Sequence, residues 1–273
     1  YLGLGDDELE VAGALMGEGL EVVGCKSVDL FVPAHCEIVI EGAIDATSML
    51  EEGPVSEYSG LYESYGKGPV VTVRHMTMRR DALFQTILPG YGREHIVIGA
   101  VAIAAVLERH LGRVFPNLAE CTITDGGCGR LHAVVALREA EQGQAEAVIV
   151  EGLSALRLVK RLVVVDDDID VHDPVQVEWA MATRMKADRD LFVFPAMASS
   201  RSDPLAVGAT VSKLGIDATR RHGDRSDWNR AVPPEAMRLK ARLALSRHAG
   251  IAANLGAAQD QGVDGRSMSS PST

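Results

Sequence analysis

The stretch LVVVDDDIDVHDPVQVEWAMATRM, residues 162–185, decides the fold of this chain. It opens on four aliphatic, mostly β-branched residues, a run typical of a buried strand. After an acidic turn, Asp173 precedes Pro174 and Gln176, which is the order of an N-cap, a proline at the first helical position and a capping box. This pattern predicts a helix over 174–185. A buried strand that turns into a capped helix is typical of a layered α/β domain.

The same alternation reaches back to Ala119. Short apolar runs alternate there with polar, helix-like segments, which predicts an α/β domain with several short strands. We expect strands at Cys121–Thr124, Leu131–Leu137, Ala147–Glu151 and Leu162–Val165, and a helix at Arg138–Gln144.

The first ninety residues follow a different pattern. Asp7 to Leu15 predicts an amphipathic helix, after which short apolar segments are separated by turn signals. We expect strands at Leu20–Cys25, Val28–Val32, Glu37–Glu41 and Val70–Arg74. Because these strands have no helix-length segments between them, a mainly antiparallel barrel or sandwich is predicted.

An apolar helix separates the two patterns. Glu94 to Arg113 is apolar almost all round, so it is expected to lie buried between layers or domains. The pattern predicts an amphipathic helix over Pro234 to His248 and a Gly/Ser-rich, disordered tail from Gln259 onward. The sequence therefore predicts an α/β (α+β) protein, with a barrel-type region at residues 1–93, a connecting helix at 94–117, an α/β domain at 118–232, and a C-terminal helix and disordered tail at 233–273.

Composition narrows the function classes. The 273 residues are 47% apolar but only 4% aromatic, and the formal net charge is −11. Without a long Lys/Arg-rich run, binding to nucleic acid or to an anionic membrane is not expected. The longest apolar run, Ile96 to Leu107, is too short to span a bilayer. The four cysteines form no Cys-x-x-Cys pair, which favours free thiols in a reducing compartment and hence a cytoplasmic protein.

The densest signal for chemistry is EEGPVSEY, residues 51–58. Gly-Pro favours a fixed turn, so Glu52 and Glu57 are expected to leave a rigid loop. When two carboxylates lie near each other, the pKa of one can be raised enough for it to hold and deliver a proton. That is the requirement of a general acid. A solvated acidic turn is the commoner meaning of an isolated Glu-x4-Glu pattern.

A second acidic run, Asp166 to Asp173, has two interpretations. Carboxylates massed after a strand can bind Mg²⁺ through oxygen ligands. The structural interpretation, which we favour, makes Asp173 a helix cap and places the others in a strand-to-helix turn. Without further information, Glu8 is expected to be a surface residue of the first helix. His95 is expected to be a packed histidine, and Lys160 a charged residue at the end of a strand.

A series of motifs runs in order from about residue 6 to residue 220. The motifs are DELEVAGAL at 7–15, VPAHCEIVIEG at 32–42, EGP and EY at 52–54 and 57–58, EH and IGA at 94–95 and 98–100, VVDDDIDV at 164–171, VEWA and ATR at 177–180 and 182–184, DP at 203–204, and KLGIDAT at 213–219. Taken together, they resemble the UbiD family of prenylated-flavin-dependent decarboxylases. An ordered series of this kind is far more specific than any one of its motifs.

The resemblance implies a carboxy-lyase that releases CO₂ non-oxidatively and reversibly from an α,β-unsaturated, aromatic or heteroaromatic carboxylic acid. Its cofactor would be prenylated FMN, which serves as the electron sink while a glutamate protonates the remaining carbon. The resemblance also implies that residues 1–93 are the C-terminal part of a flavin-binding split β-barrel domain. The α/β domain would mediate dimerisation, giving a homodimer or a higher even oligomer.

Matched position by position, the resemblance assigns roles to single residues. Glu57 would be the proton donor, and Glu52 its network partner. Glu8 would ligate a divalent metal, Mn²⁺ or Mg²⁺, between the protein and the flavin phosphate, with K⁺ nearby. Lys160 would approach the flavin as a cofactor-binding residue, and His95 would border the substrate pocket.

Two departures from the family pattern bear on activity. Val55-Ser56 stands where the family usually has Phe-Gly, a change that reshapes the surroundings of the loop. The chain also starts without Met, inside a helical pattern, and lacks the family's N-terminal half with its catalytic arginine. We therefore expect it to need that N-terminal portion or a partner subunit. The alternative is a non-catalytic subunit that dimerises and stabilises a UbiD-like complex.

Overall fold

The computed structural model describes residues 5–90, 92–221, 228, 231 and 233–246. The chain divides into two units, residues 1–224 and residues 225–273. The first unit contains all the strands in the described part of the chain. In the second unit, α6 spans Glu235–Ser246, where the sequence predicts a C-terminal helix. The tail that is predicted to be disordered from Gln259 onward lies outside the described residues.

A five-stranded sheet forms the centre of the α/β region, in the strand order β10-β11-β9-β8-β7. The three central strands β8, β9 and β11 are parallel, and the edge strands β7 and β10 are antiparallel to their neighbours. The strands are β7 (Leu118–Ile123), β8 (His132–Leu137), β9 (Arg161–Asp166), β10 (Leu191–Ala198) and β11 (Thr210–Ala218). The helices are α2 (Arg93–Val114), η1 (Asp125–Gly127), α3 (Gln144–Ala155), α4 (Pro174–Arg184) and α5 (Ala187–Asp190).

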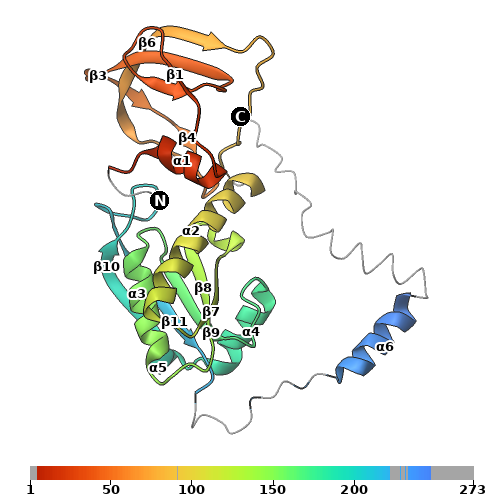
Figure 1. Cartoon of the computed structure of the whole chain (residues 1–273). Helices are drawn as coiled ribbons and strands as arrows, with labels where there is room; N and C mark the ends of the chain where they lie inside the picture. Colours follow the sequence, from red (N-terminus) through yellow and green to blue (C-terminus); the bar gives the residue numbers. More distant parts are fainter. Residues whose placement is uncertain (1–4, 91, 222–227, 229–230, 232, 247–273) are drawn as a thin grey trace, which may run out of the picture. The chain divides into compact units, whose positions relative to one another are not determined.

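Helices cover both faces of this sheet, as Figure 1 shows. Side chains alternate along each strand, so Leu162 and Val164 of β9 join the core beneath α2 and α3. Val163 and Val165 of the same strand join the core beneath α4. All of these side chains are fully buried, which explains why the central strands read as continuous apolar runs.

The start of α4 confirms the predicted N-cap Asp173 and the proline at the first position, while the backbone N–H of Asp173 donates to the carbonyl of Asp170 at 3.1 Å and not to the Gln176 side chain that a capping box requires. The side chain of Asp173 accepts hydrogen bonds from the backbone N–H groups of Val175 and Gln176, and Pro174 opens the helix. The amide of Gln176 in turn donates to the Asp173 carboxylate at 3.1 Å. These contacts satisfy N–H groups that would otherwise have no intrahelical partner.

The long helix α2 confirms the predicted connecting helix but is buried on one side only. Ile103, Leu107 and Leu111 lie in the core against the sheet. On the outer side, Ile98 and Val101 are exposed, contrary to the expectation of a helix buried all round. By length and composition α2 would suffice to cross a membrane, yet its core face already packs against the sheet and α3.

The strand predicted at Ala147–Glu151 was wrong, because these residues lie inside α3. The helix predicted at Arg138–Gln144 was also wrong, because residues 138–143 connect β8 to α3, which begins at Gln144. A short apolar run cannot distinguish a buried strand from a buried helix. The buried residues Ala145, Val148, Ile149 and Gly152 recur at helical spacing, which becomes the deciding pattern once the sheet is in place.

The region before α2 consists of α1 and antiparallel ladders of two strands each, of which β3–β6 is the longest. The elements are α1 (Glu8–Met16), β1 (Val22–Gly24), β2 (Phe31–Pro33), β3 (Ile38–Glu52), β4 (Val55–Ser56), β5 (Tyr62–Glu63) and β6 (Gly66–Met78). Strands β1 and β2, β3 and β6, and β4 and β5 form three separate pairs, which confirms antiparallel pairing. In the described part of this region, Tyr58 is the only buried hydrophobic side chain. Large apolar side chains such as Ile44, Leu50 and Met78 are exposed, so this region does not enclose a core of its own.

Candidate active site

The β4–β5 hairpin holds Glu57 in a fixed position. The backbone N–H of Glu57 donates to the carbonyl of Leu61 at 2.9 Å, and Gly60 donates to the carbonyl of Glu57 at 2.9 Å. Before the hairpin, Gly53 has a φ of +114°, and a Cβ there would lie 3.0 Å from the carbonyl oxygen of Glu63. Glycine is therefore required at the turn that separates Glu52 from Glu57.

The half-buried carboxylate of Glu57 has a hydrogen-bond donor at each oxygen. The hydroxyl of Tyr65 donates to Oε1, and the backbone N–H of Tyr58 donates to Oε2 at 3.2 Å. Burial, together with the bond to Glu57, raises the pKa of Tyr65 to about 12, so this hydroxyl remains a donor throughout the neutral range. The guanidinium of Arg201 lies over the Tyr65 ring, 4.8 Å from its centroid.

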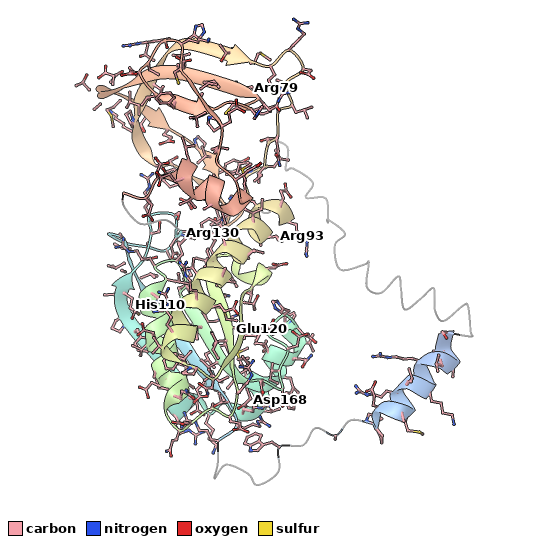
Figure 2. All side chains as sticks on the ribbon, in the orientation of Figure 1. Arg79, Arg93, His110, Glu120, Arg130 and Asp168 are labelled. Carbon is pink, nitrogen blue, oxygen red and sulfur yellow. The ribbon has the colours of Figure 1, made fainter. Side chains whose placement is uncertain are left out.

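Tyr58 ties the hairpin to the loop that follows β10. Its ring is 2% exposed, and its hydroxyl donates to the carbonyl of Ser202 at 2.9 Å. The guanidinium of Arg130, labelled in Figure 2, lies 5.3 Å from the centre of the ring. The pKa of Tyr58 is raised mainly by burial, so this hydroxyl also remains a donor. The Glu57 hairpin is thus held in place by side chains and backbone of the α/β region.

Lys160 contacts the same loop. Its Nζ lies 3.0 Å from Oδ1 of Asp203, whose side chain is fully buried. The other oxygen of Asp203 accepts a hydrogen bond from the hydroxyl of Ser199 at 3.2 Å. Loop 199–206 therefore connects Lys160 with the Glu57 hairpin, through Asp203 on one side and the Ser202–Tyr58 bond on the other.

His95 lies in the first turn of α2, close to the hairpin. Its Nδ1 accepts a hydrogen bond from the backbone N–H of Gly90 at 3.2 Å. The carbonyl of Pro89, the residue before Gly90, accepts a hydrogen bond from the hydroxyl of Ser56 at 3.0 Å. A Cβ at Gly90 would lie 4.0 Å from the carbonyl oxygen of Glu57, so the 89–90 segment rests against the hairpin. The structure thus brings His95 and Glu57 into one neighbourhood.

Glu52 and Glu8 do not join this neighbourhood in the described residues. Glu52 ends β3 with an exposed side chain that lies over Gly68, and no hydrogen bond links it to Glu57. Glu8 is the exposed first residue of α1, and Asp7 caps that helix. Within the described ranges, no group of three or more His, Cys, Asp and Glu side chains could hold a metal ion. A single carboxylate does not form a metal centre by itself, so the implied role of Glu8 as a metal ligand stays a prediction.

The acidic run that begins at Asp166, the last residue of β9, forms ion pairs with arginines. The fully buried guanidinium of Arg184 lies 2.8 Å from Asp166 and 2.7 Å from Asp168. Arg220 lies 3.3 Å from Asp166 on another side. These contacts support the structural interpretation of the run over a magnesium site.

Sequence reasoning missed four residues of this site. They are Tyr58, Tyr65, Arg130 and Arg201. Tyr58 belongs to the EY motif beside Glu57 and carried a signal, but Arg130 and Arg201 lie far from that motif in the sequence.

Two protein-family models match the chain. One, described as 3-octaprenyl-4-hydroxybenzoate carboxy-lyase Rift-related domain, matches residues 1–92. The other, described as 3-octaprenyl-4-hydroxybenzoate carboxy-lyase C-terminal domain, matches residues 96–218. The chain belongs to the UbiD family. Most of the described residues thus fall within two successive UbiD domains, and the recognition made from the sequence motifs is confirmed.

Relatives of this UbiD chain are decarboxylases. The anhydromevalonate phosphate decarboxylase of Methanosarcina mazei is 37% identical over 229 residues, which are 84% of this chain and 53% of that protein. The UbiD-class enzyme HmfF from Pelotomaculum thermopropionicum, solved with FMN, has a TM-score of 0.77 and 38% identity, over 86% of this chain and 53% of that one. An evolved dimeric form of HmfF with prFMN has a TM-score of 0.73 and 36% identity, over 86% of this chain and 51% of that one. The chain spans about half the length of the curated relatives it matches.

Proposed function

We propose that this chain carries the proton-delivering part of a UbiD-type carboxy-lyase, which acts together with the N-terminal portion of the same enzyme or with a partner subunit. The reaction is the non-oxidative, reversible decarboxylation of an α,β-unsaturated or (hetero)aromatic carboxylic acid. The observation that carries the proposal is the Glu57 carboxylate, which is half-buried on a fixed hairpin and oriented by two donors.

In this proposal Glu57 is the general acid. Tyr65 fixes Oε1, while the longer bond of 3.2 Å from Tyr58 leaves Oε2 freer to carry the proton. After CO₂ leaves, Oε2 delivers this proton to the substrate carbon, and its reprotonation readies the next cycle. Prenylated FMN, when bound, supplies the electron sink. His95, beside the hairpin, borders the substrate.

The incomplete packing of residues 1–93 supports the need for the N-terminal portion. We propose that these residues are the C-terminal part of a flavin-binding split β-barrel domain, since their strands expose apolar side chains that a complete domain would cover. Glu8 is then a candidate ligand of Mn²⁺ or Mg²⁺, whose other ligands come from the rest of the enzyme, with K⁺ nearby. Glu52 completes the acid network only in that assembly, in which Lys160 approaches the flavin.

The assembly is proposed to be a homodimer or a higher even oligomer in the cytoplasm, formed through the α/β domain. The similarity to HmfF, which has an evolved dimeric form, supports the dimer. The similarity to anhydromevalonate phosphate decarboxylase adds phosphorylated unsaturated acids to the substrates worth testing.

The decisive experiment is Glu57→Gln in the assembled protein, with Glu51→Gln as the matched control because Glu51 is an exposed neighbour on the same segment. We expect turnover to fall by about 10²-fold or more in Glu57→Gln, the usual contribution of a positioned general acid, while flavin absorbance is retained. Unchanged turnover would instead favour the non-catalytic, stabilising subunit. A lone, colourless chain without turnover would rule out the split decarboxylase.

A further inference from the structure

The face of the sheet that α4 covers is only partly closed. Paired residues on neighbouring strands point to the same side, and the register places Arg161 of β9 beside His132 of β8 and Leu214 of β11. Val163, two residues after Arg161, packs in the core beneath α4, so Arg161 faces that side as well. Arg161 and His132 both line a cavity of about 880 Å³.

This cavity lies between α2, the edge strand β7 and α4. Small apolar side chains form much of its wall, and Arg161, His132 and Thr122 supply polar groups. Its apolar wall includes Val97, Ala104, Val134, Val177 and Met181. An apolar wall with a few convergent polar groups, at this volume, is typical of a site for a small molecule.

The guanidinium of Arg161 has an N–H group without a hydrogen-bond acceptor among the described residues. Its Nε is buried and has no hydrogen-bond partner among them. Burial lowers the pKa of Arg161, against an opposing effect of the charge of Glu178 on α4. The guanidinium is thus half-buried at the cavity wall with no anion paired to it among the described residues, so an anion that reaches it gains a charge-assisted hydrogen bond.

The other polar groups suit the head of an anion. His132 has a pKa lowered to about 4 by burial and by Arg161 and Lys160, so its ring is neutral near pH 7 and offers one N–H donor. The hydroxyl of Thr122, a residue that is 9% exposed, lies on the same face as a further donor. Three acidic residues, Glu108, Asp125 and Glu178, also line the cavity, which limits an anion to a single compact charge placed at Arg161.

We propose that this cavity is a second ligand site, which binds a small organic anion with a carboxylate or phosphate head on Arg161 and a short hydrocarbon body on the apolar wall. The site is distinct from the Glu57 hairpin, because neither Glu57 nor Tyr65 nor Lys160 lines it. A planar guanidinium matches the two oxygens of such a head, which a lysine would not.

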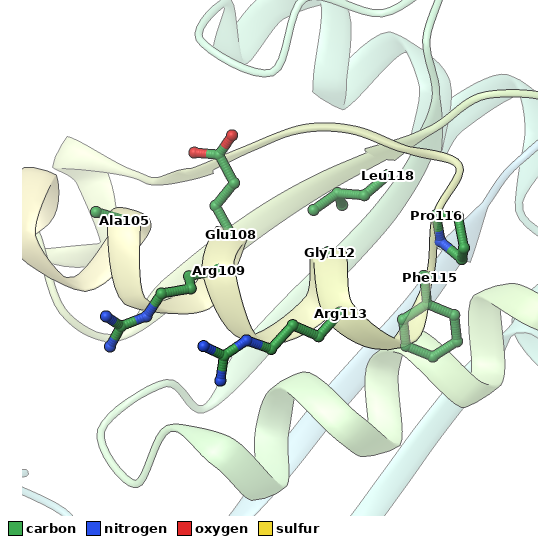
Figure 3. A pocket seen from close by; sticks show the side chains of 8 residues that line it. All are labelled: Ala105, Glu108, Arg109, Gly112, Arg113, Phe115, Pro116 and Leu118. Carbon is green, nitrogen blue, oxygen red and sulfur yellow. The ribbon is translucent and has the colours of Figure 1, made fainter.

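A second hollow on α2 lacks these features. It has a volume of about 500 Å³ and lies at the C-terminal end of the helix, where Arg109 and Arg113 project side by side (Figure 3). Both arginines are exposed to solvent, so neither requires a bound anion. Arg93, labelled in Figure 2 and lining the larger cavity, already lies 3.4 Å from Asp125.

The test is calorimetric titration of the purified protein with hexanoate, hexyl phosphate, inorganic phosphate and, as the uncharged match, hexanol. We expect saturable binding of hexanoate or hexyl phosphate that weakens at least tenfold in Arg161→Gln. The control Arg157→Gln removes the same charge from an exposed position and is expected to bind as the natural chain does. If Arg161→Gln fails to fold, Thr122→Val, which removes one hydroxyl at constant shape, is expected to weaken binding several-fold.

Three results would overturn the proposal. One is a folded protein that binds neither hexanoate nor hexyl phosphate, and another is binding that Arg161→Gln and Thr122→Val leave unchanged. The third is a shift in sedimentation of Arg161→Gln towards smaller assemblies without anion binding, which would make the cavity an interface between copies of the chain. None of these readouts requires turnover, so they are independent of the fate of Glu57→Gln.

Discussion

Replacing Tyr65 by Phe removes one oxygen and tests how Glu57 is oriented. The variant keeps the aromatic ring beneath Arg201 but loses the hydroxyl that donates to Oε1 of Glu57. A hydrogen bond to a charged group contributes about 1.5–3 kcal/mol. Because Glu57 is only half-buried, solvent screening reduces this to about 1–1.5 kcal/mol, or roughly a tenfold effect on a rate.

We therefore expect kcat for decarboxylation by the assembled enzyme to fall about tenfold in Tyr65→Phe, with KM changed less than twofold, because the hydroxyl orients the acid and does not contact substrate.

The assay follows the loss of ultraviolet absorbance of the unsaturated acid between pH 5 and 9. Tyr62→Phe is the matched control, because Tyr62 lies on the same hairpin and its side chain is 78% exposed. If Tyr65→Phe and Tyr62→Phe gave the same kcat and the same KM while Glu57→Gln was inactive, the role of Tyr65 in orienting the acid would be refuted.

Two further predictions concern stability. Arg184→Met is expected to lower the free energy of unfolding, measured in urea, by about 3 kcal/mol. This is the lower end of the range for a broken buried ion pair, because Arg220 still contacts Asp166 in the variant. A loss below about 1 kcal/mol would contradict this prediction. The pKa of His132 is lowered to about 4 from 6.5, so between these pH values the unfolded chain binds the proton and the folded chain does not. Stability is therefore expected to fall by up to about 3 kcal/mol as the pH drops from 6.5 to 4, and His132→Gln should flatten that fall in denaturation curves taken across the window.

The sequence alone determined the class of the α/β region, the capped helix α4 and the Gly-Pro turn before Glu57, but not the β4–β5 hairpin that carries Glu57. These features depend on contacts within a few residues, such as the bonds of Asp173 to Val175 and Gln176. Hydrophobic periodicity and capping operate over such short windows, so they can be read directly from the chain. The ordered series of motifs is also contained in the sequence itself, and it was sufficient to identify the UbiD family.

Only the tertiary structure decided which side chains meet. The bond of Tyr58 to Ser202, the Lys160–Asp203 ion pair and the ring contact of Arg201 join segments far apart in the sequence. The same holds for the cavity around Arg161, since it depends on how far α4 covers its face of the sheet. No local pattern encodes these contacts, because they arise from the packing of layers whose mutual position is set by the burial of the whole core.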